Sequence, residues 1–163
     1  KPDKVMDLKQ TPYPFESNSI SEVRMRNIIE HLPLEPEKFF PVLQEIYRIS
    51  MPKARVFIRC PHPNHRWQVE DLTHQKPISY DSFLLLSKTQ CQKYIDAGSS
   101  KTPLAFIYNI DFEIVDYKLF LDPEIKEHIT NVLGSFNIKL LKSYLMLFNN
   151  IGATQEFELL VKK

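Results

Sequence analysis

The sequence is poor in glycine, with only Gly98, Gly134 and Gly152 among 163 residues. Glycine lets a backbone pass close to a bound phosphate or cofactor, because a Cβ at the same position would clash. The first 97 residues therefore contain no glycine-rich loop of the kind that holds a nucleotide-type cofactor.

Cysteine is also scarce: Cys60 falls in a predicted strand and Cys91 in a predicted helix. Two cysteines in such places give no disulfide framework, and a chain without one suits a reducing compartment. We therefore expect a cytoplasmic protein with free thiols.

Long hydrophobic runs and an excess of one charge are absent too. No apolar stretch approaches the 18 residues that a membrane span needs, and the visible start has no signal-peptide pattern. The 21 basic and 20 acidic side chains give a net charge of +1, so we expect neither a nucleic-acid nor a membrane partner. Arg24, Arg26, Arg55 and Arg59 alternate along strands, and we expect no single broad basic face from them.

The residues that are present favour one packed α/β domain over 1–163, since 43% of them are hydrophobic. Residues 20–29 look like a strand, 36–49 have helical spacing of apolar side chains, and 55–60 look like a second strand. A strand, helix and strand in succession form a right-handed crossover and predict a parallel sheet. Ligands of such sheets bind at the carboxyl ends of the strands.

The flanking segments extend this pattern. The apolar run 5–8 is expected to be a short strand ending near Asp7, and 11–19 has turn chemistry. Downstream, the sequence predicts a helix over 79–97, a β-rich stretch over 104–120 and a last strand over 154–161, with helices over 123–133 and 139–150 between them.

The segment DLKQTPYPFESNSISEVRMRNIIEHL, followed by FFPVLQEIYRISMPKARVFIRCPHP, resembles the central and later motifs of class I S-adenosylmethionine-dependent methyltransferases. The resemblance covers Val5 to about Pro63 and is closest to the branch that acts on small molecules or sugars. It implies a Rossmann-like sheet, mostly parallel with an antiparallel final strand, and S-adenosylmethionine as cofactor. The family's glycine loop and its ribose-binding acid have no counterpart here, so we interpret the chain as a carboxyl-terminal portion without the first strands. Lys53-Ala54 stands where the family has a Gly-Gly turn, which must be built differently.

The resemblance also implies site residues. Asp7 and Leu8 would hold the adenine, and Asn27 to His31 would border the methyl group, with structural roles for Glu30 and His31 as the alternative. The loop 61–77 contains three histidines, and His62 or His74 is a candidate general base because histidine titrates near neutral pH. His65, Trp67 and Asp71 would bind the acceptor.

Two alternatives remain open for this loop. Cys60, His62, His65 and His74 could form a metal site, although they lack the second pair of ligands of a structural zinc signature, and we assign no metal ligand. Arg66, Trp67, Tyr80 and Phe83 could form a lid over the acceptor or could simply pack on the sheet.

We thus predict a methyltransferase that acts on a small-molecule or sugar-type acceptor, with a homo-oligomer as a candidate assembly. A noncatalytic methyltransferase-like module that binds a partner protein is the alternative, since the cofactor loop is absent from this sequence.

Overall fold

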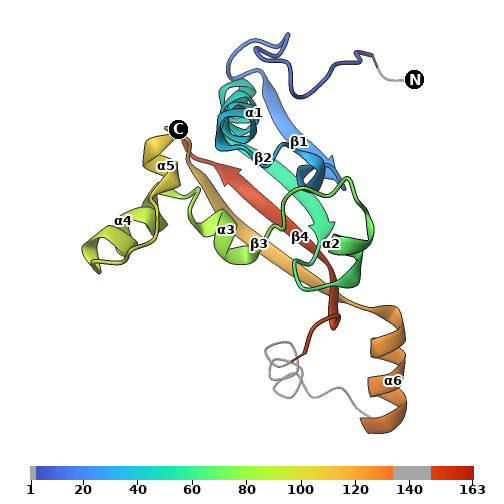
Figure 1. The fold of residues 1–163 in the computed structure, drawn as a ribbon. Helices are drawn as coiled ribbons and strands as arrows, with labels where there is room; N and C mark the ends of the chain where they lie inside the picture. Colours follow the sequence, from blue (N-terminus) through green and yellow to red (C-terminus); the bar gives the residue numbers. More distant parts are fainter. Residues whose placement is uncertain (1–2, 134–147) are drawn as a thin grey trace.

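The computed structural model describes residues 3–133 and 148–163, and these form one four-stranded sheet with helices (Figure 1). The strands are β1 (Ile20–Arg26), β2 (Ser50–Pro61), β3 (Phe112–Leu121) and β4 (Gly152–Val161). Their spatial order is β1-β2-β4-β3. β1 and β2 are parallel, whereas β4 runs antiparallel to both of its neighbours.

This arrangement confirms the predicted crossover and the predicted antiparallel ending of the sheet. The connection from β1 to β2 passes through η1 (Ile29–His31) and α1 (Pro36–Ile49), and α1 has the bounds that its apolar spacing predicts. Proline at the first position of α1 suits a helix start, because its missing N–H would have no partner there.

The remaining helices lie between β2 and β4 in the sequence. They are α2 (Arg66–Glu70), α3 (Tyr80–Leu84), α4 (Lys88–Asp96), α5 (Leu104–Ile107) and α6 (Pro123–Leu133). Among the described residues, no helix is long and apolar enough to cross a membrane. The helix expected over 139–150 lies largely outside the described residues.

Three sequence expectations are corrected. Residues 5–8 are not a strand: Lys9 N donates to Asp7 Oδ1 over 2.9 Å, which makes a turn, and Val5 is largely exposed. The single helix expected over 79–97 is two helices, because the Leu86 carbonyl accepts the Phe112 N–H and the Ser87 hydroxyl caps α4. The β-rich stretch begins as a short helix, α5, and becomes a strand only at Phe112.

One face of the sheet is covered by helices. α1 and α3 lie on the same side of the sheet in Figure 1. The Tyr47 ring of α1 contacts Phe112, and the Phe83 ring of α3 contacts Phe157. Phe157 belongs to this core and is 1% exposed. Alternate residues of β2 point into the same core, which is the period-two pattern of a half-buried strand.

The other face carries the charged residues that alternate with this core. Arg55 lies 2.9 Å from Glu158 and Arg59 lies 3.5 Å from Glu156, and the Arg24 guanidinium stacks over Phe57. The arginines share this face, but carboxylates interleave with them, so the face is mixed in charge and, as the sequence leads us to expect, is not a broad basic face.

Lys53 of β2, which stands where the resembled family has a Gly-Gly turn, adopts the left-handed conformation, with φ of +67°. It sits where the pairing of β1 with β2 changes register, between Ile20 and Glu22. The left-handed conformation costs a residue with a Cβ about 1 kcal/mol. Lys53 adopts it nevertheless, so this position does not require glycine.

Candidate active site

A pocket of about 710 Å³ opens at the carboxyl ends of β1 and β2. This volume lies within the range of small-molecule sites, and the position is the one at which parallel sheets bind ligands. Its walls come from the turn after β1, the end of β2, the loop around α2 and the start of β4: Asn27, His31, Pro61, Trp67, Glu70, Asp71, Leu72, His74 and Thr154.

The turn after β1 shapes one wall. Asn27 adopts φ of +53°, a conformation that asparagine tolerates better than most residues, and its N–H donates to the Arg59 carbonyl over 2.9 Å. The chain then turns into η1, where Ile29 and Glu30 are buried. The Glu30 carbonyl accepts the N–H groups of Gln75 and Lys76 at 2.8 and 3.2 Å, which holds the histidine loop against η1.

The pocket gathers five of the residues that the sequence nominates. Asn27 and His31 come from the turn after β1, and Trp67, Asp71 and His74 come from the histidine loop. Segments more than thirty residues apart thus contribute to one site.

Asp7 and Leu8 lie elsewhere. The Leu8 carbonyl accepts the hydroxyl of Tyr13 at 2.8 Å, and Tyr13 N bonds Glu45 of α1 at 2.7 Å. This segment borders α1 and the beginning of β1, at the opposite end of the strand from the pocket (Figure 1). The adenine-binding role of Asp7 and Leu8 stays a prediction, and the geometry does not join them to Asn27 and His31.

The remaining two predicted histidines lie beside the pocket and outside its lining. His65 is fully buried: its Nε2 lies 3.0 Å from Asp122 Oδ2, and its Nδ1 accepts the Trp67 N–H. His62 is half-buried, and burial together with the neighbouring His65 lowers its pKa. Their proposed catalytic and substrate-binding roles stay predictions.

Asp122 explains why His65 is held so firmly. Its Oδ1 accepts the N–H groups of Glu124 and Ile125 and so caps α6, while its Oδ2 faces His65. Hydrogen bonds from His65 and from those backbone groups outweigh burial and lower the pKa of Asp122. His65 therefore ties the pocket loop to the start of α6.

Glu30 is the unusual group of the site. Its side chain is fully buried, and neither carboxylate oxygen has a hydrogen-bond partner among the described residues. The third such buried oxygen belongs to Gln68, whose backbone carbonyl meets His74. Burial raises the pKa of Glu30, because an ionised carboxylate without partners is costly in a dry environment.

One ligand atom from each of Glu30, His31 and His74 lies within 4.8 Å of the other two. The two imidazole rings meet edge to face, with centroids 4.6 Å apart. Among the described residues, this is the one group of three or more metal-binding side chains so arranged.

The alternative metal set from the sequence does not assemble. Cys60, His62, His65 and His74 form no such cluster in the described part of the chain. Cys60 Sγ faces Gln155 Nε2 at 3.5 Å, and burial raises its pKa to about 12, which opposes the thiolate that a metal requires.

The four residues of the possible aromatic lid do not come together over the pocket. Phe83 is buried against Phe157, and Tyr80 packs against Tyr117 with centroids 5.0 Å apart. Arg66 lies 3.6 Å from Asp122. Of the four candidates, only Trp67 lines the pocket; packing accounts for Tyr80 and Phe83, and contacts with carboxylates account for Arg66.

Sequence reasoning missed Glu70, Leu72 and Thr154, which line the pocket, and left open whether Glu30 borders the methyl group or has a structural role. The sequence does not predict Thr154 as a pocket residue, because Thr154 comes beside Pro61 only when β4 pairs with β2 in the sheet. Glu30 had a signal: it adjoins a histidine directly after a strand that leads into a crossover.

No family model and no curated protein matches the sequence. Solved structures do match the fold. An S-adenosylmethionine-dependent methyltransferase from Methanosarcina mazei aligns with 98% of this chain and 66% of its own, with a TM-score of 0.53 and 10% identity. A second S-adenosylmethionine-dependent methyltransferase, from Archaeoglobus fulgidus, aligns with 90% of this chain and 61% of its own, with a TM-score of 0.46 and 16% identity. A structure of the Haloferax volcanii Trm112 methyltransferase activator in complex with its partner protein aligns with 98% of this chain and 61% of its own, with a TM-score of 0.48 and 13% identity.

The chain therefore has the fold of class I S-adenosylmethionine-dependent methyltransferases, in the open α/β form with an antiparallel ending that the sheet order shows. It spans less than two thirds of the length of each of these three structures. The structural alignment, with a TM-score of 0.53, shows the fold, and at 10% identity the activity has to be argued from the site.

Proposed function

We propose that this protein takes part in methyl transfer from S-adenosylmethionine to a small-molecule or sugar-type acceptor, in the pocket at the carboxyl ends of β1 and β2. The observation that carries the proposal is the convergence of Asn27, His31, Trp67, Asp71 and His74 on that pocket, in a methyltransferase fold.

Two properties of the pocket suit the binding of part of S-adenosylmethionine. The pocket is large enough for a small molecule, and the exposed Asn27 amide provides hydrogen bonds at its rim. S-adenosylmethionine, when bound, supplies an electrophilic methyl group. The chain's contribution is to orient the acceptor and to accept its proton, since positioning supplies most of the rate in such transfers.

Of the two candidate general bases, His74 has the better geometry. It lines the pocket, whereas His62 does not. Its Nδ1 lies 3.2 Å from the Gln68 carbonyl, which can only accept a hydrogen bond, so Nδ1 carries the proton and Nε2 keeps a free lone pair. His62 is the reserve assignment.

The first test is titration calorimetry with S-adenosylhomocysteine, comparing wild type with Asn27→Ala and the matched control Asn109→Ala. Both asparagines adopt a left-handed backbone, with φ of +53° and +50°, but only Asn27 lines the pocket. We expect micromolar binding that Asn27→Ala weakens about tenfold and Asn109→Ala leaves unchanged. No binding by the wild-type chain, or equal losses in both variants, contradicts the proposal.

The noncatalytic module has one observation in its favour. Among the described residues β1 pairs only with β2, so the outer edge of β1 offers backbone groups to which another chain could add a strand. Analytical ultracentrifugation tests this alternative. Self-association without any binding of S-adenosylhomocysteine supports it, and a monomer that binds the compound contradicts it.

A further inference from the structure

We propose that Glu30, His31 and His74 hold a divalent first-row metal ion whose open coordination positions face the pocket and take an oxygen atom of the acceptor. The metal site stands on the geometry of the three side chains alone. The statement about the acceptor rests on the proposed methyl transfer.

The carboxylate of Glu30 supplies the first reason. A fully buried carboxylate is normally satisfied by hydrogen bonds or by a cation, because its desolvation is otherwise uncompensated. Neither oxygen of Glu30 has a hydrogen-bond partner among the described residues, and ligand atoms of His31 and His74 lie within 4.8 Å. A cation among these three atoms would compensate the buried charge.

The hydrogen bonds of the two histidines supply the second reason. The Thr73 hydroxyl donates to Asp71 Oδ1 over 2.7 Å, so at its 2.9 Å contact with His31 Nδ1 it acts as acceptor, and that nitrogen carries the proton. His74 Nδ1 likewise donates to the Gln68 carbonyl. Both rings are thus held in the tautomer with a free lone pair on Nε2, as in metal sites whose histidines are oriented by outer hydrogen bonds.

The donor set selects the class of metal. Two imidazole nitrogens and one carboxylate suit manganese, cobalt, iron or zinc, whereas magnesium and calcium prefer oxygen ligands throughout. Metal bonds of about 2.1 Å at tetrahedral angles place ligand atoms about 3.4 Å from one another, so the three side chains, whose ligand atoms now lie within 4.8 Å, must draw together when the ion binds.

Three protein ligands leave positions open, which is the pattern of a reactive rather than a purely structural site. His31 and His74 both line the pocket, so the open positions face the space where an acceptor would lie. Asp71, whose Oδ2 is 3.8 Å from His74 Nε2, adds negative charge beside them. Metal binding and the general-base role of His74 use the same lone pair, so a loaded site would leave proton removal to another group.

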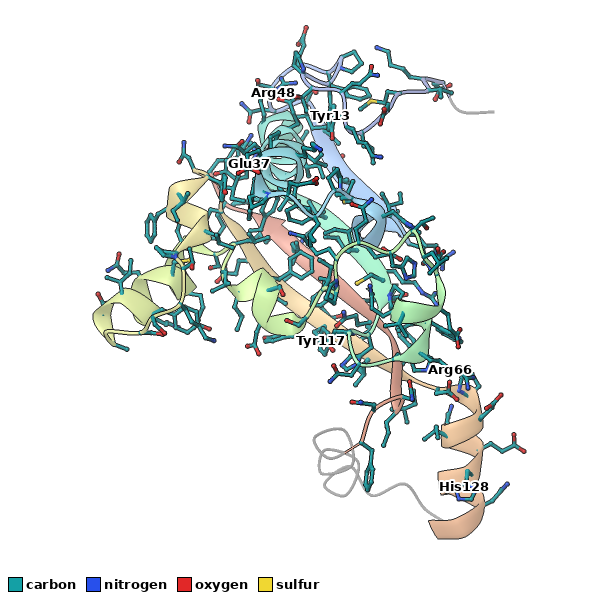
Figure 2. All side chains as sticks on the ribbon, viewed as in Figure 1. Tyr13, Glu37, Arg48, Arg66, Tyr117 and His128 are labelled. Carbon is teal, nitrogen blue, oxygen red and sulfur yellow. The ribbon has the colours of Figure 1, made fainter. Side chains whose placement is uncertain are left out.

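The test is titration of chelator-treated protein with Co²⁺, followed by its visible spectrum and by calorimetry, without S-adenosylhomocysteine. We expect one ion per chain, and at least tenfold weaker binding in Glu30→Gln and in His74→Asn. The controls are Glu37→Gln and His128→Asn, which change exposed residues of α1 and α6 (Figure 2) and should bind as wild type does.

Thr73→Val tests the outer hydrogen bond, and we expect a loss of affinity of about tenfold. His31→Asn provides a second ligand variant at a half-buried position, should Glu30→Gln fail to fold. Absence of stoichiometric Co²⁺, or equal losses in the control and ligand variants, overturns the metal site.

Acetohydroxamate, a chelator with two oxygen donors, tests the open positions. A changed Co²⁺ spectrum in the loaded protein supports acceptor binding to the metal, and an unchanged spectrum overturns that half of the proposal. S-adenosylhomocysteine binding is measured separately, so binding of that compound without cobalt refutes the metal site alone, and cobalt binding without the compound refutes the methyl-transfer proposal alone.

Discussion

Two polar clusters lie at opposite ends of the parallel pair β1–β2, and they differ in how completely their charges are satisfied. At the amino end, both oxygens of Glu45 accept hydrogen bonds from Arg48, at 2.7 and 2.8 Å, and one also accepts Tyr13 N. Arg48 further donates to the carbonyls of Tyr13 and Phe15. Tyr13 and Arg48 lie side by side in Figure 2.

At the carboxyl end, the carboxylate of Glu30 is more deeply buried and yet accepts no hydrogen bond from any residue that the structure describes. The pKa values follow this difference: hydrogen bonds from Arg48 lower the pKa of Glu45, whereas desolvation raises that of Glu30. A satisfied network stabilises the fold, and an unsatisfied one at a strand's carboxyl end indicates a site.

The largest expected effect comes from Phe157→Ala, which damages the core that both ends share. Phe157 is 1% exposed and packs against Phe83, Tyr80 and Tyr117. We expect the free energy of unfolding to fall by about 3–5 kcal/mol, measured by urea denaturation. A loss below that of the Glu45 variant would mean that the two ends do not depend on a common core.

The next largest effect is a difference between Glu45→Gln and Glu30→Gln in the change of the free energy of unfolding. Glu45→Gln removes charge-assisted hydrogen bonds from a carboxylate whose side chain is 13% exposed, so we expect a loss of about 2 kcal/mol. Glu30→Gln removes a buried charge that has no hydrogen-bond partner in the described part of the chain, so the metal-free protein should be no less stable. Urea denaturation of both variants in the presence of a chelator measures the contrast, and equal losses would remove the distinction between the clusters.

Tyr13→Phe tests one hydrogen bond of the cluster at the amino end, and we expect a smaller effect on stability. Burial, with the nearby carboxylates of Glu45 and Asp7, raises the pKa of Tyr13 to about 12, so its hydroxyl stays a donor to Leu8. We expect a loss of about 1 kcal/mol, from thermal or urea unfolding. Tyr94→Phe is the control, because its hydroxyl makes an exposed contact with Lys101; a similar loss there would point to a general effect of the substitution.

The smallest effect concerns pH at the carboxyl end. Burial and His65 hold the pKa of His62 below its usual 6.5, so the unfolded chain binds this proton more readily than the folded one. The stability that His62 contributes is present above pH 6.5 and is lost as the pH falls through its lower folded pKa. His62→Gln should flatten the decline in unfolding free energy from pH 6.5 downward, whereas an unchanged slope would contradict this.

Parts of the site were predictable because they follow from local order. The crossover over 20–60 places Asn27 and Pro61 at the same edge of a parallel sheet, and the helical spacing over 36–49 fixes α1. The break at Leu85–Ser87 was not predictable, because it depends on the Leu85 and Leu86 carbonyls bonding Ala105 and Phe112, which are distant in the sequence.

The sequence by itself determined the α/β class, the parallel crossover and the candidates Asn27, His31 and His74, since periodicity and strand ends are local properties. Only the tertiary structure decided which candidates meet. Backbone bonds from Gln75 and Lys76 to Glu30 bring His74 beside His31, while the bonds of Tyr13 hold Leu8 at the far end of β1. The burial of Glu30 without a hydrogen-bond partner among residues 3–133 and 148–163 is likewise a property of packing, because it depends on segments that approach one another only when the chain folds.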